Sequence, residues 1–367
     1  MPAICEIDET IRPFASVASQ WFVAVVMRIV NEVELRGAIA LFAKVCRVAG
    51  SHDMLQQVRE GCRRGGLTNA VAEHDNALLF EWLISAVSYQ GVSDAAATTY
   101  MNQHGRLTAN DIADTFLSPP SCPKLRGFWA FERCGFHKGS ATCSEPEHMP
   151  SCPLPAHDMR NGRLNQTAYS LHLFLRDLVG GDLVSWIDVR LKAAASDGYS
   201  PMVRRAAMRA SLLQPLGQVY GVSNKVLSMA LADLLLGADP RRPLWVEAGG
   251  SMIAIDSLVH NWLHRSGILS GLGCDHPYGA RCYGVRGCAE VIEVISASLD
   301  ARQFNPEFPI DFPRFVQKAI WRFCAQAGLD QCNGNRVDDR YPCAREDCEL
   351  GEVCGREPLK QWRGETT

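Results

Sequence analysis

The sequence predicts a protein built of α-helices, because three kinds of local signal recur along it. Apolar residues repeat at helical spacing, for example at Leu79 and Leu83. Residues that cap helix N-termini stand in front of such stretches, as Ser223 does before Asn224. Segments rich in Pro and Gly separate the helical stretches and are typical of loops.

Composition limits the class of protein. The chain has 367 residues, of which 47% are hydrophobic, so it can bury a core and form two or three domains. The net charge is −3, so binding to nucleic acid would need a local basic face. The longest apolar run, Trp21–Met27, is too short to span a bilayer, and we expect no membrane contact.

Fifteen cysteines point to metal ligation rather than to a secreted disulfide scaffold. The number is odd, and the first residues, MPAICEIDET, lack the basic and then apolar pattern of a secretory signal. We therefore expect a reducing compartment, either the cytoplasm with its nucleoid or the nucleus.

Helices are predicted in order along the chain. Residues 13–65 predict two or three amphipathic helices, with Val23, Val26, Met27 and Val30 on one face. Asp75 or Asn76 caps a helix that ends near Gln90. Further helices are predicted over 165–195, 201–236, from Asp256 onward, over Ala289–Leu299 and over 313–331. The segment between Leu236 and Asp256 is predicted to be a loop, because it carries Arg241-Arg242-Pro243 and Gly249-Gly250.

Three groups of cysteines lie outside these helices. A proline-rich loop region, residues 113–160, carries Cys122, Cys134, Cys143 and Cys152. A long loop needs something to hold it, and either a zinc ion or the packing of four ordinary buried thiols would serve. The C-terminal group comprises Cys332, Cys343, Cys348 and Cys354, whose thiolates suit iron–sulfur or zinc.

The third group, Cys274, Cys282 and Cys288, does not by itself complete a metal site. His260 and His264 lie on the helix after Asp256, and we expect them to pack or to face solvent rather than to bind metal.

Lys225 and Asp256 are the candidate catalytic residues. Each stands at the N-terminus of a predicted helix, Lys225 just inside one and Asp256 as the cap of the next. A carboxylate can stabilise a developing sugar cation, and an amine can attack its carbon. The turn before Lys225 can hold a phosphate with its backbone N–H groups.

This pattern resembles the helix-hairpin-helix DNA glycosylases, typified by endonuclease III and oxoguanine glycosylase. Their hairpin L-P-G-V-G-x-K is matched by Gly221, Val222 and Lys225, and their V-D-x-x-V-x-R-x-x-x-R helix by Asp256, Val259 and Arg265. This sequence departs from the pattern at Tyr220, Ser223 and Asn261, and its gap from Lys225 to Asp256 is longer.

Two further segments carry the resemblance. The run LLFEWLISAVSYQGVSDAAA is similar to an early family helix that ends in a glutamine near the lesion pocket, which places Gln90 there. Gln90 would then fill the gap left by a flipped base or contact that base, whereas the alternative is a solvated helix end. The C-terminal cysteines resemble the family's C-x6-C-x2-C-x5-C loop, which holds a [4Fe–4S] cluster, but have the longer spacing C-x10-C-x4-C-x5-C. Zinc and unligated cysteines remain the alternatives.

The resemblance implies an all-α fold with two helical lobes, a helix-hairpin-helix motif and an interlobe cleft. The family-like core is expected over 71–112 and 160–330, with a cluster loop and tail over 331–367. A helical extension over 1–70 and a Cys-rich and Pro-rich insert over 113–159 lie outside the resemblance. The implied residue roles are catalysis by Asp256 and Lys225, and DNA contact by Gln90, Gly221, Val222 and Ser223.

The function that the resemblance implies is excision of a damaged or modified base from DNA by a monomeric glycosylase that flips the base and can act as a lyase. The rival interpretations are a non-catalytic DNA-binding or structural protein that kept the scaffold and a zinc protein unrelated to DNA.

Overall fold

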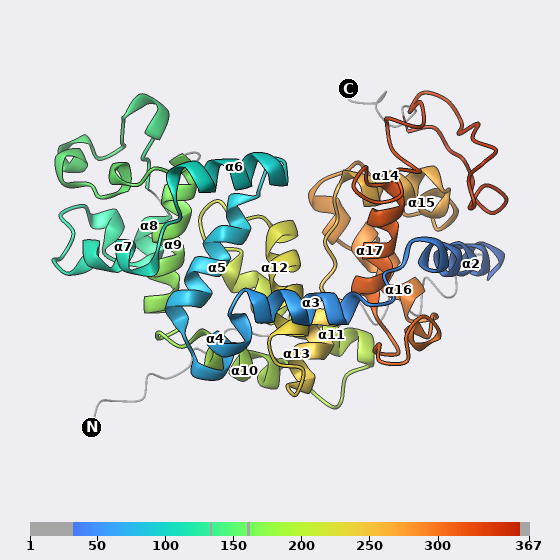
Figure 1. The fold of residues 1–367 in the computed structure, drawn as a ribbon, viewed down its shortest axis with the longest axis horizontal. Helices are drawn as coiled ribbons and strands as arrows, with labels where there is room; N and C mark the ends of the chain where they lie inside the picture. Colours follow the sequence, from blue (N-terminus) through green and yellow to red (C-terminus); the bar gives the residue numbers. More distant parts are fainter. Residues whose placement is uncertain (1–31, 133, 160–161, 360–367) are drawn as a thin grey trace.

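The computed structural model describes residues 32–132, 134–159 and 162–359, and these form helices and loops without a β-strand (Figure 1). The predicted all-α class is therefore confirmed. The predicted face of Val23, Val26, Met27 and Val30 lies outside the described residues. Within the described ranges, no helix combines the length and the apolar character needed to cross a membrane.

The first half of the chain contains α2 (Glu32–Ala49), α3 (Met54–Arg64), α4 (Leu67–Glu73), α5 (Asn76–Ser88), α6 (Asp94–His104), α7 (Ala109–Ala113), α8 (Phe128–Phe131) and α9 (Gly162–Asp177). The second half contains α10 (Leu183–Ala194), α11 (Pro201–Leu216), α12 (Asn224–Gly237), α13 (Pro243–Ser251), α14 (Ser257–Arg265), α15 (Ile268–Gly271), α16 (Cys288–Ser296) and α17 (Pro313–Cys324). The insert between α7 and α9 consists mostly of loops and short 3₁₀ turns.

Local caps set several of these helix starts. The side chains of Asp75, Ser223 and Asp256 each accept a hydrogen bond from a backbone N–H in the first turn that follows. These contacts satisfy N–H groups that a helix leaves without an internal partner. The predicted caps are confirmed.

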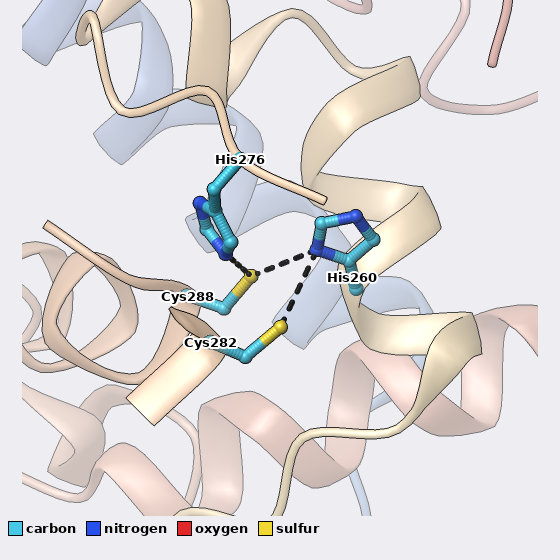
Figure 2. A group of neighbouring side chains, drawn as sticks. All are labelled: His260, His276, Cys282 and Cys288. Atoms are coloured by element: carbon cyan, nitrogen blue, oxygen red, sulfur yellow. Dashed lines mark hydrogen bonds between the residues drawn. The ribbon is translucent and has the colours of Figure 1, made fainter. Parts of the chain in front are cut away.

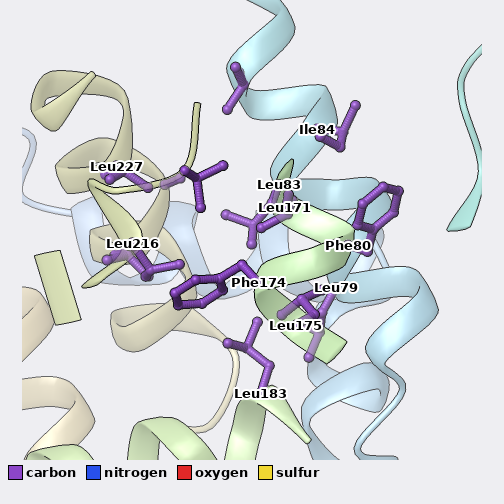
Figure 3. Packing of buried hydrophobic residues seen from close by; sticks show 14 of the residues in the cluster. Leu79, Phe80, Leu83, Ile84, Leu171, Phe174, Leu175, Leu183, Leu216 and Leu227 are labelled. Atoms are coloured by element: carbon purple, nitrogen blue, oxygen red, sulfur yellow. The ribbon is translucent and has the colours of Figure 1, made fainter. Parts of the chain in front are cut away.

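The first hydrophobic core lies among α5, α9, α10, α11 and α12 (Figure 3). It includes Leu79 and Leu83 from α5 and Phe174 from α9, and Leu216 and Leu227 come from the two helices around the hairpin. Phe174 is completely buried. Burial of these side chains stabilises the helices more than their intrinsic propensities do.

A second core joins helices from the two ends of the described chain. Phe42 of α2 stacks edge-on against Trp262 of α14, with ring centroids 5.6 Å apart. Val291 of α16 and Phe315 of α17 belong to the same core. The helix that carries Asp256 at its N-terminus is thus packed in a different core from most of the helix that carries Lys225.

Three sequence predictions about element boundaries were wrong. Residues 165–195 form two helices, α9 and α10, because Gly180 and Gly181 take positive φ angles of 71° and 81° between them. The last helix ends at Cys324 rather than at 331. Beyond it the chain turns back on itself, and Gln331 donates its N–H to Phe323 O at 2.9 Å.

The third error concerns residues 243–251, which form α13 instead of a loop. Pro243 stands in the first turn, where its missing N–H costs nothing. A side chain at Gly249 would come within 2.9 Å of Leu235 Cβ on α12. The glycines that suggested a loop therefore permit close packing of α13 on α12.

Buried ion pairs connect α11 to α16 and to the loop before α17. Both terminal guanidinium nitrogens of Arg209 donate to the Glu293 carboxylate, at 2.9 and 2.6 Å. Arg205 also contacts Glu293 at 3.7 Å and donates to Asp311. Burial raises the pKa of Asp311, an effect that Arg205 opposes. The pairs fix the position of the first helix of the hairpin relative to the second core.

We predict that Glu293→Gln lowers the free energy of unfolding by about 3–5 kcal/mol, because it leaves the buried guanidinium group of Arg205 and the partly buried one of Arg209 without their shared counter-charge. The matched control is Glu73→Gln on the exposed end of α4, which should change it by less than about 0.5 kcal/mol. Urea unfolding followed by circular dichroism measures both. Equal effects of the two variants would contradict this account of the ion pairs.

Candidate functional site

The hairpin between α11 and α12 lies against α9. Gly221 has a φ of 76°, and a Cβ there would meet Thr167 Oγ1 at 2.8 Å. Tyr220 donates its backbone N–H to Ser170 Oγ at 3.0 Å. Only glycine can occupy position 221 without backbone strain or a steric clash, so the turn depends on Gly221.

Gln90 joins the end of α5 to this hairpin. Its Nε2 donates to Gly221 O at 2.9 Å, and its Oε1 accepts the N–H of Ser223 at 3.1 Å. Both ends of the amide thus bind the hairpin backbone on either side of Val222. The structure therefore places Gln90 as a clamp on the turn, which neither sequence interpretation had anticipated.

Lys225 and Asp256 meet in space although they lie in different helices. Lys225 Nζ is 4.0 Å from Asp256 Oδ2, and the Lys225 side chain is 42% exposed against 15% for Asp256. The other carboxylate oxygen of Asp256 accepts the N–H of Val259 at 2.9 Å. One oxygen therefore caps α14, while the other faces an amine in the first turn of α12.

Two tyrosines next to Asp256 were missed from the sequence. The Tyr283 hydroxyl accepts the N–H of Ile255 at 2.8 Å and lies 3.3 Å from the Ile255 carbonyl, to which it donates. It thereby holds the backbone immediately before Asp256. Tyr278 is half exposed, and its pKa is raised first by burial and then by the nearby charge of Asp256. The sequence carries no periodic signal for either contact.

A cavity of about 420 Å³ lies elsewhere, between α5, α6 and the end of the insert. Its wall includes Tyr100, His104 and Asp158, and His104 Nδ1 is 2.6 Å from Asp158 Oδ2. Its lining does not include Lys225 or Asp256. The interlobe cleft around those two residues therefore stays a prediction.

A compact group of side chains that can ligate a metal lies beside α14, which contributes His260 (Figure 2). His260, His276, Cys282 and Cys288 are all buried, and their ligand atoms lie within 4.8 Å of one another. His260 Nδ1 is 3.3 Å from Cys288 Sγ and 3.6 Å from Cys282 Sγ, and His276 Nε2 is 3.3 Å from Cys288 Sγ. Two imidazoles and two thiols in this arrangement can hold one metal ion.

One expectation about this segment was wrong, because His260 belongs to a group that can hold a metal, whereas His264 does not. The three cysteines do not complete a site by themselves, as expected, since Cys282 and Cys288 are joined by two histidines and Cys274 is outside the group. The signal that could have revealed the group is the even spacing of His276, Cys282 and Cys288, which is H-x5-C-x5-C. His260 is added only by the tertiary fold.

The four cysteines of the insert also come together. Ser121 and Ser151, each next to one of them, share a hydrogen bond at 2.6 Å, and Lys124 lies 3.4 Å from Glu145. The pKa of Cys152 is raised by burial and then by the thiols of Cys134, Cys143 and Cys122. No three of these thiols meet the 4.8 Å spacing of the His–Cys group. The zinc site at Cys122, Cys134, Cys143 and Cys152 stays a prediction.

The C-terminal cysteines gather around the end of α14. Cys343 donates its N–H to Arg356 O at 3.1 Å, and Cys354 Sγ is 3.9 Å from Arg265 O. Burial first, and then the thiols of Cys332, Cys348 and Cys343, raise the pKa of Cys354 to about 11. As in the insert, no three of these thiols lie within 4.8 Å of one another.

Comparison of the chain with protein-family models, with curated proteins and with solved structures finds no match.

We predict that Gln90→Leu releases the hairpin. The variant removes the acceptor of the Ser223 N–H and the donor to Gly221 O, so amide hydrogen exchange of residues 218–227 should become at least about tenfold faster, which corresponds to about 1.4 kcal/mol of lost local stability. Gln103→Leu, at an exposed glutamine of α6, is the control and should leave this segment unchanged. Mass spectrometry of the exchanged peptides measures both, and unchanged exchange in Gln90→Leu would refute the clamp.

Proposed function

We propose that this protein is a DNA glycosylase that excises a damaged or modified base, with Asp256 and Lys225 as its catalytic pair. The observation that carries the proposal is the 4.0 Å distance between Lys225 Nζ and Asp256 Oδ2. The resemblance assigned these two residues to one reaction although 30 residues separate them in the sequence. Their proximity supports a shared role, as does the clamped turn beside them.

The proposed reaction begins with a nucleotide turned out of the duplex, because the bond to its base cannot be reached inside the stack. The first turn of α12 offers N–H groups to a backbone phosphate near that nucleotide. The bond from C1′ to the base breaks, and the base leaves with the bonding electrons and takes up a proton from water. The Asp256 carboxylate stabilises the positive charge that develops on the sugar.

Lys225 completes the reaction as an unprotonated amine. Its Nζ forms a bond to C1′, the ring oxygen leaves C1′ and gains a proton, and a protonated Schiff base results. Loss of a proton from C2′ then expels the 3′ phosphate and cuts the strand. The 42% exposure of the Lys225 side chain leaves it accessible to a flipped sugar.

We expect Lys225→Ala to abolish the covalent adduct that borohydride traps between the protein and DNA, because no other amine is paired with Asp256 in the described structure. Lys192→Ala, at an exposed lysine of α10, should retain the adduct. An adduct of normal yield in Lys225→Ala would reject the role of this lysine.

Asp256→Asn should slow base release at least about a hundredfold, because the amide lacks the charge that stabilises the sugar cation. The amide oxygen can still accept the Val259 N–H, so the cap on α14 is retained. Asp114→Asn, at an exposed position, is the control. The measurement is base release from oligonucleotides that carry a panel of modified bases. Salt-sensitive DNA binding without base release by the unmodified protein would favour the non-catalytic alternative.

We further propose that Cys332, Cys343, Cys348 and Cys354 bind a [4Fe–4S] cluster. The four thiols come close enough to raise the pKa of Cys354, and cysteine thiolates are the usual ligands of such a cluster. The cluster would serve as a structural crosslink. Its ligand loop already contacts the end of α14, where Gly355 donates its N–H to Ser266 O at 2.8 Å.

Protein purified without oxygen should therefore be brown and contain about four iron atoms per chain. Cys343→Ser should lose most of that iron, because serine is a poor ligand for a soft metal cluster. Cys46→Ser, which replaces a buried thiol of α2, should keep it. Colourless protein with bound zinc in place of iron would overturn the cluster assignment.

A further inference from the structure

We propose that His260, His276, Cys282 and Cys288 form a closed structural zinc site that fixes the loop beneath Asp256. The identity of the ion follows from the ligand geometry. Zinc bonds of about 2.3 Å to sulfur and about 2.0–2.1 Å to nitrogen place sulfur and nitrogen about 3.6 Å apart on a tetrahedron. Three of the four nitrogen–sulfur distances in the group are 3.3, 3.3 and 3.6 Å.

The spacing also excludes a two-iron centre. Two irons bridged by sulfide would hold the imidazole pair and the thiolate pair on different metals. His260 Nδ1 instead lies within 3.6 Å of both Cys282 Sγ and Cys288 Sγ, so one ion must serve all four ligands. A tetrahedral set of two sulfurs and two nitrogens is typical of zinc.

A hydrogen bond outside the group prepares His276 for a metal. His276 Nδ1 is 2.7 Å from the carbonyl oxygen of Cys274, which can only accept a hydrogen bond. The proton of the neutral ring is therefore on Nδ1, and the lone pair of Nε2 points toward the Cys288 thiol. Metal-bound histidines are oriented in this way by carbonyl groups behind them.

Burial and charge fit a structural ion. His276 is 1% exposed, and Cys282 and Cys288 are completely buried, so water has no open ligand position. Two thiolates neutralise the charge of Zn²⁺, which makes the centre neutral and reduces the cost of burying the ion. A catalytic zinc would instead retain an open coordination position.

The ligands connect a loop to the helix of the candidate catalytic carboxylate. His260 lies one turn after Asp256 on α14, whereas the other three ligands come from residues 276–288, which contain little regular structure. Cys282 precedes Tyr283, whose hydroxyl binds both backbone groups of Ile255. An ion in the group therefore holds the backbone on both sides of Asp256.

Removal of one thiolate ligand tests the site. By elemental analysis, Cys282→Ser and Cys288→Ser should each contain about one zinc ion per chain less than the unmodified protein. Cys274→Ser is the matched control, because Cys274 is buried in the same loop but is not a ligand. The serine hydroxyl of this variant can keep the hydrogen bond that the Cys274 thiol donates to Leu272 O. Equal zinc in the three variants and the unmodified protein would overturn the proposal.

Diffraction from crystals of the unmodified protein provides a test that does not depend on variants that fold. Anomalous scattering at the zinc absorption edge should give a peak between the four side chains. A disulfide between Cys282 and Cys288, or a diffraction map without a peak at this position, would overturn the site.

The proposed effect of the ion on catalysis by Asp256 rests on the proposed function. It is measured separately, by hydrogen exchange of the backbone around Asp256. Cys282→Ser should speed hydrogen exchange of residues 252–258 at least about tenfold and should slow base release. Normal exchange in a variant that has lost zinc would refute the coupling. Absence of base release from the unmodified protein would refute the glycosylase proposal and leave the zinc measurement standing.

Discussion

The arrangement of the candidate site depends on two helix N-termini that face each other from different cores. Lys225 lies in the first turn of α12, which packs mostly in the first core, and Asp256 caps α14, which packs in the second. The 4.0 Å separation of their side chains therefore exists only while the two cores keep their relative position. A single partly exposed ion pair contributes little stability and cannot set that position itself.

Stronger contacts around the pair set the position. The Glu293 carboxylate binds Arg209 with two hydrogen bonds and so ties α11 to α16. Gln90 binds the backbone of the hairpin from the side of α5. On the opposite side, Tyr283 binds the backbone before Asp256. Each partner of the pair is thus anchored through its backbone, which leaves both side chains available for chemistry.

The cysteine groups share one physical task, which is to hold polypeptide that lacks regular structure. The insert, the loop of residues 272–288 and the C-terminal loop contain few helical hydrogen bonds, and each contains thiols that approach one another. The groups differ in the distance between ligands. Only the buried histidine–cysteine group is compact enough, among the residues described, for a single ion.

The sequence alone determined the features that depend on residues close together in the chain. The all-α class, most helix starts and the caps at Asp75, Ser223 and Asp256 were predictable, because a cap is formed by residues within four positions of one another. Where a local signal had two meanings, the prediction failed. Gly249 signals a loop in sequence, yet here it allows α13 to approach α12.

Tertiary structure decided the rest, because the relevant contacts join distant segments. The proximity of Lys225 and Asp256 required two cores in a fixed relation, and only a family resemblance could suggest it beforehand. His260 appeared to be an ordinary residue on an amphipathic helix until the fold brought His276, Cys282 and Cys288 beneath it. Sequence spacing reports which ligands a loop offers, but side-chain packing determines which of them meet.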